Sequence, residues 1–431
     1  MTVELKSSTG LSMSRRMASV PRGSRTRRSI GAFMTPFPSP AYDGRTYQTV
    51  VVAEAPYVGV RVIIRNNGPA YTLNDLAVAP SANAPPGRNP SGGAGSWVRC
   101  TLAGANGPWT IPAALATNRP SYTVFDLVDM TSLARTDGDT LPLLFARAYY
   151  ATGPASGYAN TTNPVPSGHT TEWPGTSSGS TTTVTSYNRG RIIQADSAAG
   201  NFVTSNQGGF TANNAYSTIL GEFEFLHARN ALTVMALGDS ITQGDTSSAN
   251  MLSPLHIACA NVSTPSRPVC CMNYGFSSQK STNFRERLQD AITAGVKPGV
   301  VVYSAWTPNE WTTQTGLWVT EMALMRKNLA LIIDLCNANN IALVVSTGIP
   351  KNGLNTTYDA IRIGYNNEIR ALANQGISVV DYDAVMTDGA TPANLIAAYT
   401  SDNTHPNDAG YELMGAALTP IIQAMSDAYF A

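Results

Sequence analysis

The first half of the chain carries its apolar residues in short runs that are separated by Gly, Pro, Asn and Ser. The runs are rich in β-branched and aromatic residues, and Phe223, Glu224 and Phe225 alternate apolar with charged positions. Short, punctuated and alternating runs are typical of antiparallel strands that pack as two facing sheets. The pattern predicts a β-sandwich, jelly-roll-like in class, over residues 46–229. Strands are expected at 49–53, 58–64, 122–128, 141–150 and 216–226.

Two stretches of this half, 81–96 and 152–183, are rich in Pro, Gly, Ser and Thr. This composition does not favour regular structure, so we expect two long surface loops. We interpret them as loops of one sandwich and not as linkers to further domains.

From residue 230 onwards, strand-length apolar runs alternate with helix-length amphipathic segments. Alternation of this kind predicts a parallel sheet covered by helices on both faces. The prediction for residues 230–431 is a three-layer α/β/α domain of flavodoxin-like class. One helix is expected to begin at Asn283 as N-cap, with Glu286 at N3, and to stop at Gly295. The expected strands are 232–237, 271–274, 299–305, 341–346 and 377–381, and the other expected helices are 317–335, 358–374 and 408–427.

Composition and charge exclude several classes of function. The chain has 431 residues, of which 43% are hydrophobic and 13% charged, and 28 Lys+Arg balance 28 Asp+Glu. Zero net charge lacks the electrostatic signature of a nucleic-acid binder, and no apolar stretch is long enough to span a membrane. We therefore expect a globular two-domain protein with no nucleic-acid partner and no membrane partner.

Basic residues are concentrated at the N-terminus, where seven Lys and Arg residues in the first 28 positions face one acidic residue, Glu4. No apolar segment follows them, so this start is not typical of a secretory signal peptide. We assign residues 1–45 as a basic arm. The arm is either a solvated tail or a segment that docks on a partner, and docking would give a homo-oligomer or attachment to a virion.

The five cysteines and four histidines do not form a metal signature. No pair of cysteines has CxxC spacing, and an odd number of cysteines does not build a disulfide framework. We expect buried free thiols and no metal, with a bridge from Cys259 to Cys270 or Cys271 left open as an alternative.

Two strings carry candidate chemistry. GDSITQG at 238–244 follows an apolar strand, and ligands bind at the carboxyl ends of strands in open α/β sheets. DNTHPN at 402–407 precedes the last helix, and an Asp three residues before a His is able to orient its imidazole. Each string alone is also compatible with a turn or a helix cap. Together they supply the nucleophile, the base and the orienting carboxylate of a serine hydrolase.

These strings resemble the SGNH hydrolases, also called GDSL esterases or lipases, and the resemblance covers residues 230–431. The GDSxTxG block of that family matches 238–244, and its DxxHPN block matches 402–407. The resemblance implies that Ser240 is the nucleophile, that His405 is the general base and that Asp402 orients the imidazole. It also implies ester hydrolysis with no cofactor.

Two further blocks of the family supply an oxyanion hole. Gly275 follows the second strand and resembles the glycine whose amide binds the oxyanion beside the amide of Ser240. The third block, GxND, is present only as WTPNE at 306–310, with tryptophan at the glycine position, an added proline, and glutamate at the aspartate position. The resemblance implies that the side-chain amide of Asn309 is the remaining donor.

Trp306, Trp311 and Gln243 are candidate substrate-binding residues, and the two tryptophans either stack on a sugar ring or belong to the core. No apolar lid follows the first block, because 245–250 is polar, and the added sandwich resembles the accessory modules of carbohydrate esterases. The sequence therefore favours a carbohydrate O-acetylesterase, whose substrate is an acetylated polysaccharide or a small ester. The alternatives are a lipase or thioesterase on small acyl esters, and a non-catalytic glycan-binding protein.

An enzyme for extracellular polysaccharide that lacks a signal peptide requires another route out of the cell. A bacteriophage tail spike or fibre, released by lysis and attached through its basic arm, meets this requirement. We therefore expect a virion or extracellular location, with the cytoplasm as the alternative.

Overall fold

The computed structural model describes residues 25–29, 44–66, 68–82, 96–116, 119–136, 141–152, 192–204, 211–212, 222–247, 253–311 and 318–431. Within these residues the chain separates into two compact units. The β unit lies within residues 23–231 and 263–270, and the α/β unit lies within residues 232–262 and 271–431.

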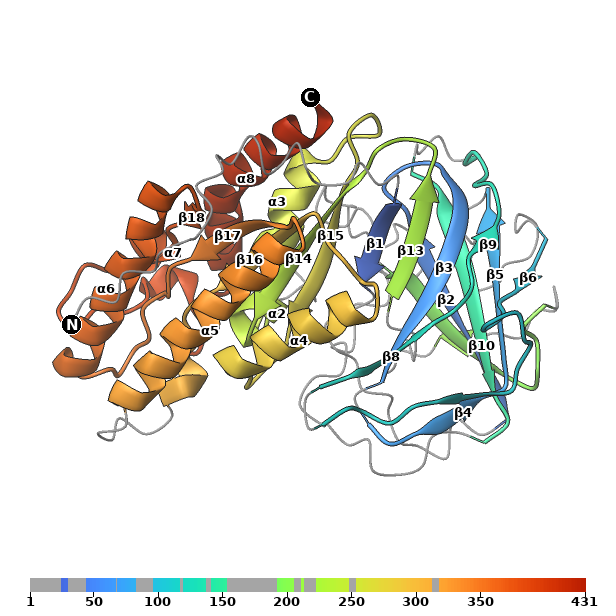
Figure 1. Ribbon diagram of the computed structural model, residues 1–431, viewed down its shortest axis with the longest axis horizontal. Helices are drawn as coiled ribbons and strands as arrows, with labels where there is room; N and C mark the ends of the chain where they lie inside the picture. The colour runs from blue at the N-terminus through green and yellow to red at the C-terminus, as the bar shows by residue number, and fades with distance from the viewer. Residues whose placement is uncertain are drawn as a thin grey trace. The chain divides into compact units, whose positions relative to one another are not determined.

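The β unit is built from antiparallel sheets (Figure 1). The first sheet has the strand order β1(Arg25–Ser29), β13(Glu222–His227), β3(Tyr57–Asn66) and β8(Ser121–Val124), with β9(Val128–Asp129) also paired to β3. The second has the order β12(Thr211–Ala212), β11(Ile192–Ala199), β2(Arg45–Val52), β10(Leu143–Tyr150), β5(Asp75–Ser81) and β6(Val98–Arg99). A short pair, β4(Tyr71–Leu73) with β7(Trp109–Ile111), forms a third sheet. The predicted antiparallel β architecture is confirmed.

One cluster of buried side chains joins the two larger sheets. Val62 and Phe225 from the first sheet and Val78 and Leu144 from the second belong to this cluster, and none of them is more than 1% exposed. Burying such aliphatic and aromatic side chains contributes roughly 1.5–3 kcal/mol each, which makes this cluster the main source of stability of the unit.

Glu224 does not lie on a solvent-facing side of its strand, as the alternating pattern suggests, because its side chain is fully buried. Strand β13 lies between β1 and β3, and its register places Glu224 opposite Arg61, whose guanidinium lies 3.3 Å from the carboxylate. Glu222 is buried in the same way against Arg65 at 3.2 Å. The charged positions are therefore buried as cross-strand ion pairs, in which each guanidinium offsets the charge of a buried carboxylate.

The predicted N-terminal arm over residues 1–45 includes one strand of the first sheet. Arg25–Ser29 forms β1 and pairs antiparallel with β13, with Arg25 opposite Leu226. This pairing uses the backbone groups at the edge of β13, which local composition does not reveal. The rest of the arm up to residue 43 lies outside the described residues, as do most of the two predicted surface loops and residues 216–221 of the last predicted strand.

The α/β unit is built on a five-stranded sheet (Figure 1). Its order is β15(Val269–Gly275), β14(Leu232–Gly238), β16(Val300–Ser304), β17(Ala342–Ser346) and β18(Ser378–Val380), and the pairings from β14 to β18 are parallel. Helix α3(Pro254–Val262) packs with α8(Asp408–Phe430), and α4(Ser281–Thr293) packs with α5(Trp318–Ala338). The remaining helical segments are α2(Ser240–Gln243), η3(Pro308–Trp311), α6(Thr356–Ala371), η4(Leu372–Gln375), α7(Tyr382–Met386) and η5(Ala397–Tyr399).

This strand order, with the first strand between the second and the third, is that of flavodoxin-like sheets. Right-handed crossovers then place α3 on one face and α4 and α5 on the other, and α8 packs beside α3, as Figure 1 shows. The predicted three-layer fold is confirmed. The edge formed by the carboxyl ends of the strands carries the first and last motifs of the unit.

One local expectation was wrong, and one helix was not expected. Helix α4 begins at Ser281, with Lys280 as N-cap, and Asn283 occupies N3, where its side chain accepts a hydrogen bond from the Lys280 amide at 3.1 Å. An Asn three positions into a helix is able to close the first turn as well as an N-cap does, so the spacing alone misplaced the start. Helix α3 was not expected, because seven of its nine residues are buried and its sequence lacks an amphipathic period.

Candidate active site

Ser240 is the first residue of the short helix α2, which follows β14 after a tight turn at Asp239. Asp239 caps α2 by accepting a hydrogen bond from the amide of Ile241 at 3.0 Å. Gly244 ends the helix in the left-handed region, with φ of 96°, a conformation that glycine adopts without strain. The GDSITQG string therefore forms strand end, cap, one helical turn and stop, and it presents Ser240 at the carboxyl edge of the sheet.

The loop before α8 brings His405 to Ser240, although the two residues are 165 positions apart in the chain. His405 Nε2 lies 2.8 Å from Ser240 Oγ, and His405 Nδ1 lies 2.6 Å from Asp402 Oδ2. An ionised carboxylate only accepts hydrogen bonds, so Nδ1 carries a proton toward Asp402 and Nε2 accepts from the serine hydroxyl. The arrangement is able to remove the hydroxyl proton of Ser240.

Asp402 also organises its own loop. Its Oδ1 accepts hydrogen bonds from the amides of Thr404 at 2.9 Å and His405 at 2.7 Å. Partial burial would raise the pKa of Asp402, but the hydrogen bonds from the His405 ring and from these two amides outweigh burial and hold the pKa below its usual value. The carboxylate is therefore ionised at neutral pH.

Two hydrogen bonds tie the segment after α2 to the histidine loop. Thr246 Oγ1 donates to the carbonyl of Pro406 at 2.8 Å, and the hydroxyl of Tyr411 donates to the carbonyl of Asp245 at 2.8 Å. Tyr411 is fully buried in the first turns of α8. These contacts fix the separation of the serine turn and the histidine loop through groups other than the catalytic candidates themselves.

Gly275 lies at the end of β15, where only glycine fits. A Cβ at this position would lie 2.3 Å from the Gln243 amide nitrogen, so the backbone of β15 approaches that of α2 directly. The amide of Gly275, expected to point at an oxyanion, donates to Asn273 Oδ1 at 2.8 Å. The glycine thus has a packing role that the motif alone does not reveal, and its amide has an acceptor within the protein.

Asn309 lies in η3, and its Nδ2 donates to the carbonyl of Gln279 at 3.0 Å. A primary amide has two hydrogens, so one remains available to a ligand. Thr307 Oγ1 donates to Asp239 Oδ2 at 2.5 Å and accepts from the backbone N–H of Asn309 at 3.3 Å. Thr307 therefore joins the residue before Ser240 to the loop that carries Asn309, a link that sequence analysis missed because it spans 68 positions.

Asp239 is 1% exposed and supports this link. Burial raises the pKa of Asp239, and hydrogen bonds from Thr307 and the Ile241 amide act in the opposite direction. Its carboxylate accepts hydrogen bonds from the Ile241 amide at the start of α2 and from the Thr307 hydroxyl. It forms no hydrogen bond with the His405 ring. Its role in the site is structural, as a cap and a bridge.

Glu310, at the aspartate position of the third block, caps helix α4. Its Oε1 accepts from the Ser281 amide at 2.9 Å and from the Ser281 hydroxyl at 2.6 Å, and the residue is 2% exposed. A carboxylate is favourable at the N-terminus of a helix of this length. Glu310 thereby fastens η3, and with it Asn309, to the body of the unit.

The three candidate substrate-binding residues differ in their surroundings. Trp306 is 3% exposed, packs on Gly348 and lines the cavity described below. Gln243 Oε1 accepts from the Ser277 amide at 2.7 Å and braces the loop after β15. Trp311 ends η3, and its side chain lies outside the described residues.

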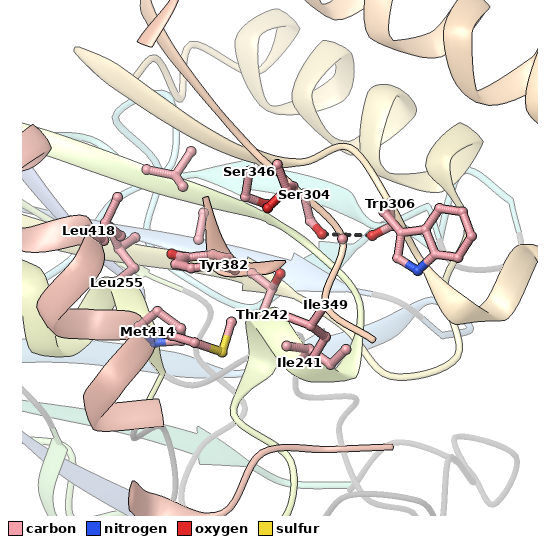
Figure 2. A pocket seen from close by; sticks show the side chains of 15 residues that line it. Ile241, Thr242, Leu255, Ser304, Trp306, Ser346, Ile349, Tyr382, Met414 and Leu418 are labelled. Carbon is pink, nitrogen blue, oxygen red and sulfur yellow. Dashed lines mark hydrogen bonds between the residues drawn. The ribbon is translucent and has the colours of Figure 1, made fainter. Parts of the chain in front are cut away.

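An uncharged cavity of about 40 Å³ lies beside the serine turn. Ile241 and Thr242 line it, and Figure 2 shows them with Trp306 and Ile349 at one end and with Leu255 and Leu418 at the other. Its helical lining comes from α2, α3, α7 and α8, and its other lining residues come from the sheet and from the loops at the carboxyl ends of the strands. No part of it comes from the β unit.

Among the described residues, the other histidines and the cysteines form no metal site. His256 Nδ1 lies 2.8 Å from Ser253 Oγ in a buried pair at the start of α3. All five cysteines are buried and free, so the alternative bridge from Cys259 is not formed. Across the described residues there is no cluster of His, Cys, Asp or Glu suited to a metal ion, and no helix long and apolar enough to cross a membrane.

Comparison with known proteins identifies the domain that carries this site. Residues 236–413 match the model of the GDSL-like Lipase/Acylhydrolase family. No curated protein matches the sequence.

Solved structures resemble less than half of the chain. A GDSL-like lipase from Bacteroides thetaiotaomicron VPI-5482 is 25% identical, with a TM-score of 0.34, over 46% of this chain and 88% of the lipase. The acetyl xylan esterase AlAXEase is 19% identical, with a TM-score of 0.36, over 44% of this chain and 100% of its own. A lipase/acylhydrolase from Enterococcus faecalis is 21% identical, with a TM-score of 0.34, over 45% and 96% of the two chains.

Proposed function

Because residues 236–413 are a GDSL-like lipase/acylhydrolase domain, we propose that this protein hydrolyses carboxylic esters with Ser240 as nucleophile. The observation that carries the proposal is the row of contacts from Ser240 Oγ through the His405 ring to Asp402, at 2.8 and 2.6 Å. A serine hydroxyl becomes an effective nucleophile when a neighbouring base removes its proton and a third group orients that base.

In the proposed mechanism, Ser240 Oγ attacks the ester carbonyl while His405 Nε2 takes the hydroxyl proton. Asp402 holds the imidazole in the required tautomer and stabilises the imidazolium that forms. Collapse of the tetrahedral intermediate transfers the proton from His405 to the leaving alcohol and leaves an acyl-enzyme. Water then enters, His405 accepts its proton, and the acid is released from Ser240.

The amide of Ser240 and the free N–H of Asn309 Nδ2 are the proposed donors to the oxyanion. The Gly275 amide contributes in this proposal only as a shared donor, because it already donates to Asn273 Oδ1 at 2.8 Å. Each dedicated donor to an oxyanion stabilises the transition state by about 2.7–4 kcal/mol. Two such donors account for a large part of the rate enhancement that an esterase needs.

We further propose that the natural substrate is an O-acetylated carbohydrate. Two features of the chain support this choice: residues 245–250 provide no apolar lid after the first block, and a β unit accompanies the hydrolase domain. The finer proposal is tested separately, by measuring acetate released from an acetylated polysaccharide and from its deacetylated form. A lipase would instead favour esters of long fatty acids.

Hydrolysis of p-nitrophenyl acetate by wild type and Ser240→Ala tests the ester hydrolase proposal. We expect wild type to turn over the ester and Ser240→Ala to lose activity by roughly 10⁴-fold or more. Ser426→Ala, the same change at a buried serine near the end of α8, is the matched control and keeps full activity. Equal rates for wild type and Ser240→Ala would favour the alternative of a non-catalytic glycan-binding protein.

A further inference from the structure

We propose that the uncharged cavity beside Ser240 is an acyl pocket, and that it accepts acyl groups of about two to four carbons and excludes longer ones. The inference rests on the proposed function, since an acyl pocket requires that Ser240 attack the carbonyl. It adds which end of the ester enters the fold and which chain lengths fit.

The cavity adjoins the turn that carries the proposed nucleophile, although Ser240 itself is not among its lining residues. Ile241 and Thr242, the two residues after Ser240, line it together with Ile349 from the loop after β17. From this edge it extends along the sheet to Ala236 and Val302, each two residues before the end of its strand. Two residues of strand span about 7 Å, so the cavity runs inward from the serine turn and is not a surface depression.

The lining suits an alkyl chain. No residue that lines the cavity is charged, and Leu255 of α3 and Leu418 of α8 close its inner end. Two of the hydroxyls on its wall are used within the protein: Ser304 Oγ donates to the Trp306 carbonyl at 2.8 Å, and Thr347 Oγ1 donates to Asp381 at 2.9 Å. Thr242, Ser346 and Tyr382 also line the cavity, but its volume of about 40 Å³ holds roughly three water-sized groups, which is too small for a sugar ring and large enough for a short alkyl chain.

The volume sets the length limit. A cavity of about 40 Å³ holds roughly three water-sized groups, since one such group needs about 10–15 Å³ measured in this way. An acetyl group places one carbon beyond its carbonyl, and a butyryl group places three. Butyryl therefore fills the cavity, and octanoyl exceeds it by four carbons.

A series of p-nitrophenyl acetate, butyrate, hexanoate and octanoate tests the proposal in the full-length protein. After correction for the hydroxide-catalysed rate of each ester, we expect kcat/KM for butyrate to exceed that for acetate by about tenfold, as two buried methylenes predict. We expect octanoate to fall at least tenfold below butyrate.

Two variants change the size of the cavity in opposite directions. Ala236→Val adds two methyl groups at the inner end and should remove the advantage of butyrate over acetate. Leu418→Ala enlarges the inner end and should move the optimum to hexanoate. Leu329→Ala, a buried leucine in α5 on the other face of the sheet, is the matched control for lost packing and should keep the wild-type profile. Thermal unfolding of each variant shows that it is folded.

The outcomes separate this inference from the proposed function. Esters hydrolysed by wild type and not by Ser240→Ala, with the two cavity variants shifting the optimum as stated, support both. Hydrolysis with a profile that folded Ala236→Val and Leu418→Ala leave unchanged would overturn the acyl pocket alone. If no ester is hydrolysed faster by wild type than by Ser240→Ala, the proposed function fails, and this inference fails with it.

Discussion

His405 is held at both ring nitrogens, by Ser240 Oγ at 2.8 Å and by Asp402 Oδ2 at 2.6 Å. Because the carboxylate accepts a hydrogen bond from His405 Nδ1–H, the tautomer that leaves Nε2 as an acceptor is favoured. The same carboxylate accepts hydrogen bonds from two backbone amides of its own loop. One side chain therefore sets the conformation of the loop and the protonation pattern of the ring together.

The lowered pKa of Asp402 predicts a pH-dependent stability. Burial raises the pKa of Asp402, but the hydrogen bonds to its carboxylate lower the pKa by a larger amount. The folded-state value therefore lies below the unfolded value of about 3.9. The stabilisation is therefore present above that unfolded value and is lost as the pH falls through the folded value. We expect urea unfolding to show a larger stability difference between wild type and Asp402→Asn at about pH 6 than at about pH 3. A difference that is the same at both pH values would contradict this assignment.

Asn309 is the residue whose role in the transition state is tested most directly. If its free N–H donates to the oxyanion, Asn309→Ala lowers kcat on p-nitrophenyl acetate by about 10²-fold or more and changes KM little. Loss of the bond to the Gln279 carbonyl affects stability, so thermal unfolding is measured alongside. A variant with wild-type kcat would remove Asn309 from the oxyanion hole.

At the scale of elements, helix α6 holds the loop after β17 in place. Asn366 accepts from the Gly348 amide and donates to the Gly348 carbonyl, both at 2.8 Å, and Arg362 donates to the same carbonyl at 3.0 Å. Arg362 is itself buried between Asp359 and Asp383. The helix thereby fixes a loop that packs on Trp306, three residues before Asn309.

Gly348→Ala tests whether this packing matters to the site. The added Cβ would lie 2.2 Å from Cγ of Trp306, so either the loop or the ring has to move. We expect a loss of about 1–3 kcal/mol in the free energy of unfolding, together with a lower kcat/KM.

The control is Gly364→Ala, in α6, where an added Cβ meets nothing within 4 Å. Alanine is favoured over glycine inside a helix by about 0.8–1 kcal/mol, so this variant is expected to be more stable with unchanged activity. Full stability of Gly348→Ala would show that the loop is not held as tightly as its contacts indicate.

At the scale of the whole molecule, the basic N-terminal segment is the proposed site of assembly with a partner or with further copies of the chain. Because Arg25–Ser29 is a strand, a deletion that tests assembly has to end before it. We expect removal of residues 1–22 to lower the number of chains per particle, obtained by dividing the molar mass from size-exclusion chromatography with light scattering by the mass of one chain. The deleted protein is expected to keep its esterase activity. An unchanged number of chains per particle would assign the segment to a tail with no assembly role.

Local pattern was sufficient for the fold classes of both halves. Alternating short runs and the switch to strand and helix at residue 230 depend on periodicities within one element. Elements whose signals are not local were missed or misplaced: α3 has no amphipathic period, and β1 exists only by pairing with β13. The burial of Glu224 likewise follows from its neighbours across the sheet.

The sequence by itself determined the chemistry available to this protein, because the identities of Ser240, Asp402 and His405 and their places at strand and helix ends are local properties. Tertiary structure alone decided which groups meet. It brought Ser240 and His405 together across 165 positions. It paired the Gly275 amide with Asn273 Oδ1 and the Gln243 side chain with the Ser277 amide. It also left a cavity between the sheet and α8. The physical reason is that hydrogen bonds and cavities depend on separations of a few ångströms between distant segments, and only the packing of complete side chains sets those separations.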